Sequence, residues 1–144
     1  MIAYFDTSAI IPLLVEESGS AIAGQLWDQA DRVASVRLVY AEARAALAQA
    51  ERLARLTPRQ LPRLVDQLDG LYGQLDRIGV DDTLVRRAGQ LAQAHALRGY
   101  DAVHLAALER IADDHPVMVS GDEDLCAAAA ALGVATASTS RPHL

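Results

Sequence analysis

Short apolar runs alternate along the chain with longer helical patterns, which is typical of strands that alternate with helices. Apolar residues dominate at Ile2–Phe5, at Val33–Val36 and at Val117–Val119, and weaker runs occur at Arg77–Val80 and Gly133–Thr136. The first run has no polar alternation, as expected of a strand covered on both faces. We therefore predict an α/β fold in which βαβ units form a parallel sheet of four or five strands, with helices on both faces.

The expected helices are marked by start and stop signals as well as by composition. Thr57, Pro58 and Gln60 form the sequence of a capping box with proline at the first helical position. Either of Asp81 and Asp82, or Thr83, can cap a later helix. We expect helices at about 8–15, 20–30, 38–56, from 58 past 68, at 84–97, 101–112 and up to 132. The tail, 138–144, is predicted to be frayed.

The length and cysteine content indicate a single domain over residues 1–144. No linker or repeat interrupts the 144 residues, a length that can bury a core without disulfides. The single cysteine, Cys126, cannot form an internal disulfide, which favours a reducing compartment. No targeting segment or membrane-spanning run is recognised, so we expect a cytoplasmic protein.

The charge composition narrows the function classes. A net charge of −6 argues against a protein held on nucleic acid by a broad basic surface, but it permits a nuclease that binds phosphate through metal ions. All 13 basic residues are arginine, which excludes any mechanism that needs a catalytic lysine.

Asp6 is the first candidate for a functional residue. It follows the apolar run Ile2–Phe5 directly, so it is expected at the carboxyl end of a buried strand. Ligands of open α/β sheets bind just outside those strand ends.

Two further acids lie in apolar helical surroundings. The helical neighbours of Glu42 offer it no basic partner, although a solvated glutamate at a helix edge would fit the same pattern. Asp101 opens an apolar helix, where it can act as an N-cap or as a site residue. His104 lies one turn later, and we expect it to be a buried, hydrogen-bonded histidine rather than a metal ligand, since no second His or Cys stands at ligand spacing.

A fourth acid follows the strand Val117–Val119. Asp122 resembles Asp6 in its position, but its ordinary role is to cap the next helix. Ser120 with Glu123 could form a capping box instead, and Asp124 could also be the cap. The choice between Asp122 and Asp124 as the fourth site acid stays open at this point.

These segments together resemble a PIN domain, and in particular its VapC-type toxin ribonucleases. The resemblance is carried in order by Phe5-Asp6-Thr7-Ser8, by Glu42, by Gly99–Ala106 and by Ser120–Leu125, and it covers essentially the whole chain. Val103 departs from the family pattern, in which leucine is common.

The resemblance implies a ribonuclease that hydrolyses RNA phosphodiester bonds as the toxin of a toxin-antitoxin pair. It implies metal binding and catalysis by Asp6, Glu42, Asp101 and Asp122, with Asp124 as a further or alternative acid, and supporting roles for Thr7, Ser8 and Ser120. It also implies a homodimer and a cognate antitoxin protein as partners.

The chemistry of such a set predicts its cofactor. Two carboxylates about 4 Å apart repel by roughly 4 kcal/mol at an effective dielectric near 20, so converging acids require a cation. Oxygen ligands without His or Cys favour Mg²⁺, with Mn²⁺ as a substitute.

Three other kinds of protein share part of this sequence pattern. A receiver-like Mg²⁺-binding signalling domain has a similar sheet but is expected to need a lysine, which is lacking here. A haloacid-dehalogenase-like phosphatase would need a second aspartate two residues after Asp6, where Ser8 stands. A catalytically silent PIN scaffold that binds proteins remains possible on sequence alone, although all four acids are present.

Overall fold

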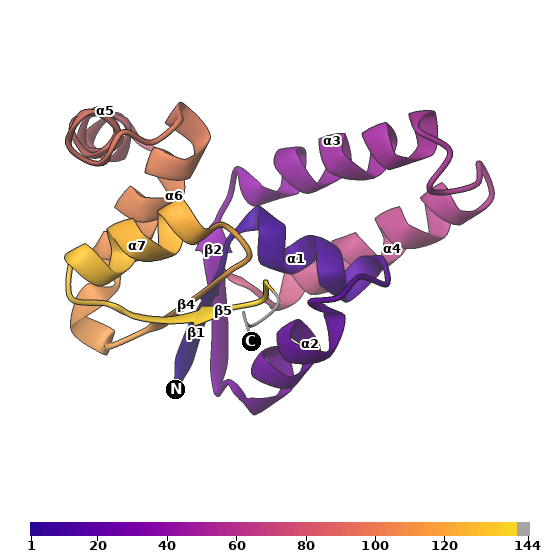
Figure 1. Cartoon of the computed structure of the whole chain (residues 1–144), viewed down its shortest axis with the longest axis horizontal. Helices are drawn as coiled ribbons and strands as arrows, with labels where there is room; N and C mark the ends of the chain where they lie inside the picture. The colour runs from indigo at the N-terminus through magenta and orange to yellow at the C-terminus, as the bar shows by residue number, and fades with distance from the viewer. Residues whose placement is uncertain (141–144) are drawn as a thin grey trace.

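The protein, described for residues 1–140 by a computed structural model, is built on one five-stranded sheet in which all neighbouring strands are parallel. The strand order is β3-β2-β1-β4-β5. Figure 1 shows the sheet between two groups of helices. The strands are β1 (Ile2–Phe5), β2 (Arg32–Val36), β3 (Asp76–Ile78), β4 (Val117–Ser120) and β5 (Ala135–Ser138). The predicted α/β class with a parallel sheet and helices on both faces is confirmed.

The apolar run of β1 is buried on both faces, as predicted. Ala3 and Phe5 pack into one hydrophobic core, and Tyr4, which points to the opposite face, packs into the other. All three side chains are fully buried. Because successive strand residues face opposite sides, a central strand with two covered faces must be apolar at every position.

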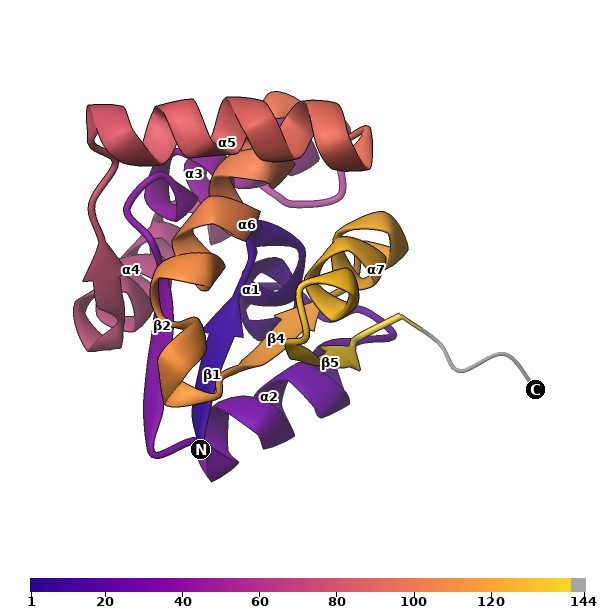
Figure 2. The same cartoon turned by 90° about the vertical axis from the view of Figure 1, so that its left-hand side faces the viewer.

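Four helices cover one face and three cover the other (Figures 1 and 2). The first group connects β1 to β2 and β2 to β3, whereas the second connects β3 to β4 and β4 to β5. Right-handed crossovers that run in opposite directions from β1 place their helices on opposite faces. The first group is α1 (Thr7–Leu14), α2 (Ser20–Gln29), α3 (Val39–Arg52) and α4 (Gln60–Gln74); the second is α5 (Asp82–His95), α6 (Gly99–Arg110) and α7 (Glu123–Ala131), with a 3₁₀ turn at Ala112–Asp114.

Several boundaries follow the predicted signals. The Thr57 amide donates to Gln60 Oε1 at 2.8 Å and the Gln60 amide donates to Thr57 Oγ1 at 3.2 Å, which forms the predicted capping box. Asp81 caps α5 through the Leu84 amide at 2.8 Å. In contrast, α3 ends at Arg52 rather than near residue 56, and the chain turns through Ala54 with φ of 58°.

The prediction of a frayed tail from residue 138 is wrong for its first part. Ser138 belongs to β5, two residues beyond the predicted end of that strand, and Thr139 is buried. The Thr139 amide donates to the Ser120 carbonyl at 3.0 Å, so pairing with β4 extends past the strand. The rest of the predicted tail, 141–144, lies outside the described residues. Within residues 1–140, no helix has the length and apolar character that a membrane span requires.

The sheet order defines where a ligand site is expected. From β1 the chain moves first to β2 and β3 on one side, then to β4 and β5 on the other. The carboxyl ends of β1 and β4 therefore flank the point at which the strand order reverses, which is the usual ligand crevice of open α/β sheets. Asp6 follows β1 and Asp122 follows β4 at this point.

Candidate active site

Asp6 is buried and held by three hydrogen bonds. It caps α1: its Oδ1 atom accepts from the Ala9 amide at 3.2 Å and from Ser8 Oγ at 2.7 Å. Its Oδ2 atom accepts from Ser120 Oγ at 2.8 Å. The residue is 4% exposed. The extended backbone at a helix N-cap thus fixes the carboxylate at the end of β1.

Two serine hydroxyls connect the end of β1 to the end of β4. Ser8 Oγ lies 3.2 Å from Ser120 Oγ and accepts from the Gly121 amide at 2.8 Å. Ser120 Oγ also accepts from the Asp122 amide at 2.9 Å. Both serines, predicted as supporting residues, therefore tie Asp6 to the segment that carries Asp122.

The structure separates the roles of Asp122 and Asp124. Asp122 is the N-cap of α7, and its Oδ1 atom accepts from the Asp124 amide at 2.9 Å and the Leu125 amide at 3.2 Å. Ser120, the alternative cap, is not the N-cap of α7, and its Oγ atom contacts Asp6 Oδ2 and the Asp122 amide. Asp124 is exposed and lines a separate cavity with His95 and Ala127.

His104 links Glu42 to the core. The imidazole is 1% exposed; its Nε2 atom lies 2.8 Å from Glu42 Oε1 and 3.3 Å from Thr7 Oγ1, and its Nδ1 atom lies 2.8 Å from the Tyr4 hydroxyl. Burial raises the pKa of Tyr4 well above its ordinary value, so its hydroxyl keeps its proton and can donate to Nδ1. The Nε2–H group donates to Glu42 Oε1. His104 is the expected buried, hydrogen-bonded histidine, and it orients Glu42.

Asp101 is not the cap of its helix. It is the third residue of α6, whose N-cap is Arg98. The Arg98 Nε atom donates to Asp101 Oδ2 at 3.1 Å, and its Nη2 atom lies 4.0 Å from Asp122 Oδ2. Sequence reasoning missed Arg98, although its i,i+3 spacing to Asp101 across a helix start was a usable signal. The guanidinium brings Asp101 and Asp122 together as their shared counter-ion.

Burial of Asp6 shapes the electrostatics of the site. Desolvation raises the pKa of Asp6, and the positive potential at His104 together with the serine hydroxyls partly offsets the rise. At the exposed rim, the hydrogen bond to Asp101 raises the pKa of Arg98. Because burial makes Asp6 costly to ionise, a cation bound nearby would stabilise its ionised form.

A cavity of about 640 Å³ opens beside these residues. Thr7, Glu42, Arg98 and Asp101 contribute its polar lining, and α3 supplies most of its apolar wall. Within residues 1–140, no three acidic, histidine or cysteine side chains lie close enough together to hold a metal ion. The carboxylate oxygens of Asp6, Glu42, Asp101 and Asp122 are the kind of donor that Mg²⁺ and Mn²⁺ prefer. In this structure Arg98 is the cation that contacts two of these acids, Asp101 and Asp122.

Comparisons with known proteins identify the family of this chain. The PIN domain family model matches residues 3–131. The chain is similar to ribonuclease VapC45 of Mycobacterium tuberculosis, with 41% identity over 132 residues and 92% of each chain covered.

Two solved structures share the fold. The crystal structure of M. tuberculosis VapC20, described as a sarcin-ricin loop cleaving toxin, superimposes with a TM-score of 0.67 at 20% identity, covering 89% of this chain and 95% of that one. A toxin-antitoxin complex from Klebsiella pneumoniae gives a TM-score of 0.62 at 17% identity, covering 87% and 90%.

The family model covers most of the chain, and the VapC45 similarity spans nearly all of both proteins. The predicted resemblance is therefore confirmed, and the chain belongs to the PIN domain family.

Proposed function

We propose that this protein is a metal-dependent endoribonuclease that hydrolyses RNA phosphodiester bonds and acts as the toxin of a toxin-antitoxin pair. One observation carries the proposal: a PIN-family chain, 41% identical to a protein named as a ribonuclease, has four acids around the strand-order reversal of its sheet. Asp6 and Asp122 follow β1 and β4, and Glu42 and Asp101 line the adjoining cavity.

The acids Asp6, Glu42, Asp101 and Asp122 would hold Mg²⁺, for which Mn²⁺ can substitute. When bound, such an ion supplies charge neutralisation at the phosphodiester and lowers the pKa of a water molecule. We favour Asp122 over Asp124 as the fourth acid because Asp122 contacts the same arginine as Asp101, whereas Asp124 faces another cavity.

The chain's own polar groups would position these acids. Ser8 and Ser120 donate to the two carboxylate oxygens of Asp6 and leave it few ways to rotate. Thr7 and His104 lie against one another, and His104 directs Glu42 toward the cavity. Arg98 would compensate the charge of Asp101 and Asp122 in the metal-free protein, and it must yield part of that contact when a metal binds.

The partners follow from the same proposal. We expect a cognate antitoxin to inhibit the enzyme, because the fold is shared with the toxin-antitoxin complex from K. pneumoniae. We also expect a homodimer and a cytoplasmic location, where RNA substrates are available. A catalytically silent scaffold is disfavoured, since a protein-binding role alone does not require four acids at the ligand crevice.

The proposal is tested by expressing the chain with and without the product of its genomic neighbour and mapping the RNA ends that form. We expect growth arrest and new RNA ends when the chain is expressed alone, and neither when the neighbour is co-expressed. RNA ends that are identical in the two cultures and in an empty-vector culture would contradict a ribonuclease toxin.

A further inference from the structure

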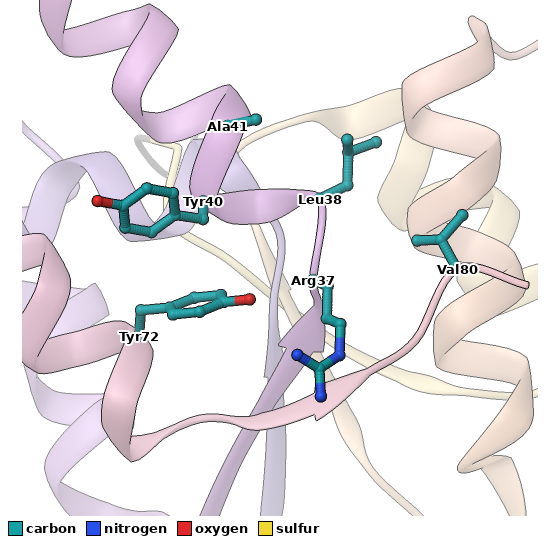
Figure 3. Close-up of a pocket in the computed structure, with 6 residues that line it drawn as sticks. All are labelled: Arg37, Leu38, Tyr40, Ala41, Tyr72 and Val80. Atoms are coloured by element: carbon teal, nitrogen blue, oxygen red, sulfur yellow. The ribbon is translucent and has the colours of Figure 1, made fainter.

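A second cavity adjoins the acid-lined cavity. It has a volume of about 650 Å³, within the range of small-molecule sites of roughly 300 to 1,000 Å³. Leu38 and Ala41 line both cavities, so the two meet at the N-terminal end of α3. Figure 3 shows its six lining residues: Arg37, Leu38, Tyr40, Ala41, Tyr72 and Val80.

The aromatic wall of this cavity is fixed by its neighbours. The rings of Tyr40 and Tyr72 are 5.0 Å apart at 61°, an edge-to-face contact between α3 and α4. The Tyr40 hydroxyl donates to Asp69 Oδ1 at 2.6 Å and accepts from Arg44 Nη1 at 3.0 Å. In Figure 3 the Tyr72 hydroxyl points toward the segment that carries Arg37. A rigid aromatic wall of this kind suits a planar ring.

Two arginines at or beside this cavity form no ion pair with any described residue: Arg37 lines the cavity, and Arg77 contacts the Tyr72 ring. Arg37 and Arg77 are exposed, and no carboxylate within residues 1–140 lies at ion-pair distance from either. The guanidinium of Arg77 lies 5.0 Å from the centre of the Tyr72 ring. Tyr40 and Tyr72 are partly buried, so each keeps some accessible ring surface. Arginines without an ion pair beside accessible aromatic surface are a combination that binds single-stranded nucleic acid, through phosphates and stacked bases respectively.

We propose that this cavity is a subsite for the RNA substrate, which receives a nucleobase next to the cleaved bond while Arg37 and Arg77 contact the flanking phosphates. The inference rests on the proposed ribonuclease function and adds the path of the RNA: from the acids, across Leu38 and Ala41, to Tyr72. An apolar peptide could fill the cavity equally well, but it would leave Arg37 and Arg77 unpaired. A polyanion satisfies both features.

The test measures binding of fluorescein-labelled oligouridine by anisotropy over a range of salt concentrations, in the full chain carrying Asp6→Asn to prevent cleavage. The double variant R37Q/R77Q is expected to bind roughly tenfold more weakly and to lower the slope of log K against log salt by about 0.7 for each arginine lost. Arg59→Gln is the matched control. Arg59 is also exposed and unpaired among the described residues, but it is the N-cap of α4, whereas Tyr72 lies near the C-terminal end of that helix.

A second readout locates the base directly. Oligouridine with 5-iodouracil should crosslink to Tyr72 on irradiation, and Tyr72→Leu should abolish that adduct. Because Tyr72 also packs against Tyr40, the exposed arginine variants keep the test valid if Tyr72→Leu does not fold.

Four results would overturn the inference. The first is an R37Q/R77Q effect no larger than that of Arg59→Gln, and the second is a crosslink at a site away from the cavity. The third is a change in oligomeric state, measured by sedimentation, with RNA binding unaltered, which would assign the surface to a protein partner. The fourth is cleavage of RNA by R37Q/R77Q at the wild-type rate, which contradicts the subsite but not the ribonuclease function. If the wild type itself cleaves no RNA, the proposed function is contradicted as well.

Discussion

Asp6 and Asp101, which we propose as acids of one metal site, are held by different kinds of partner. Asp6 is 4% exposed and is fixed by two serine hydroxyls and a backbone amide. The side chain of Asp101 is 16% exposed and is paired with Arg98, whose own side chain is 83% exposed. One acid is therefore positioned by short, buried groups, and the other by a long side chain that is free to move.

From this difference we expect substitutions near Asp6 and substitutions near Asp101 to affect different properties of the protein. The groups that bind Asp6 belong to α1, which follows β1 directly, and to β4, so their geometry is set by two neighbouring strands of the sheet. The Arg98 contact costs little to break, because an exposed ion pair stabilises a protein by about 0 to 1 kcal/mol. We expect changes on the Asp6 side to affect both stability and cleavage, and changes on the Asp101 side to affect mainly cleavage and metal binding.

The largest effect on the exposed side is expected from Asp101→Asn. Loss of one charged group should lower the cleavage rate roughly 100- to 1,000-fold, by analogy with removal of other groups that stabilise transition-state charge. The unfolding free energy should change by less than about 1 kcal/mol, because the lost pair with Arg98 is exposed. Asp113→Asn, at an exposed position in the 3₁₀ turn Ala112–Asp114, is the control for both measurements. A large loss of stability in Asp101→Asn without loss of cleavage would contradict the expectation that Asp101 acts mainly in cleavage.

Ser120→Ala probes the buried side. Asp6 Oδ2 loses its donor and the Asp122 amide loses its acceptor, so the free energy of unfolding should fall by about 1 to 3 kcal/mol. Cleavage should fall roughly tenfold because Asp6 is less well oriented. Denaturant unfolding and initial cleavage rates measure the two effects. Ser138→Ala removes an exposed hydroxyl from neighbouring β5 and is the control. It should change the free energy of unfolding by no more than about 0.5 kcal/mol and leave the cleavage rate unchanged. Equal effects of the two substitutions would contradict a role for the buried hydrogen bonds of Ser120.

Arg98→Gln should tighten metal binding by a few-fold, roughly 1 kcal/mol, because a cation that competes for Asp101 and Asp122 is removed. Titration with Mn²⁺, followed by electron paramagnetic resonance, measures the affinity. Arg86→Gln breaks another exposed pair, with Asp82, and serves as the control. Weaker Mn²⁺ binding in Arg98→Gln would show that the arginine supports the metal site instead of competing with it.

The smallest expected effect is a pH dependence of stability in chelator. Burial raises the pKa of Asp6 in the folded state, so the folded protein binds this proton more tightly than the unfolded chain. The Asp6 contribution to the unfolding free energy therefore decreases as pH rises from its ordinary pKa through the raised one. Subtracting the profile of Asp6→Asn isolates this contribution. A difference profile that rises with pH over that window would contradict the assigned direction.

Local signals were sufficient to predict much of the fold. The apolar run of β1, the capping box at Thr57 and Gln60, and the aspartate before α5 each specify a boundary through contacts within a few residues. The end of the chain was less predictable, because β5 and Thr139 are ordered by pairing with β4, which no local pattern announces.

The sequence predicts candidate acids for the site, and these stay predictions, but it does not predict the side chains that contact them. Asp6 was defined by the strand before it, whereas the cap of α7 could be assigned to Asp122 only once Ser120 was seen to bind Asp6. The helix that contains Asp101 begins two residues earlier than expected, which makes Arg98 its N-cap and its counter-ion. Contacts between Arg98 and Asp122, or His104 and Glu42, depend on how α6 packs, and sequence spacing does not encode them.

The central claim is that Asp6 anchors a metal site that cleaves RNA, and RNA cleavage by the wild type and Asp6→Asn across a Mg²⁺ titration tests it most directly. We predict that the wild type cleaves in proportion to bound Mg²⁺ and stops in excess chelator, while Asp6→Asn stays folded and cleaves at no concentration. Undiminished cleavage by Asp6→Asn, or full activity of the wild type in chelator, would contradict the account.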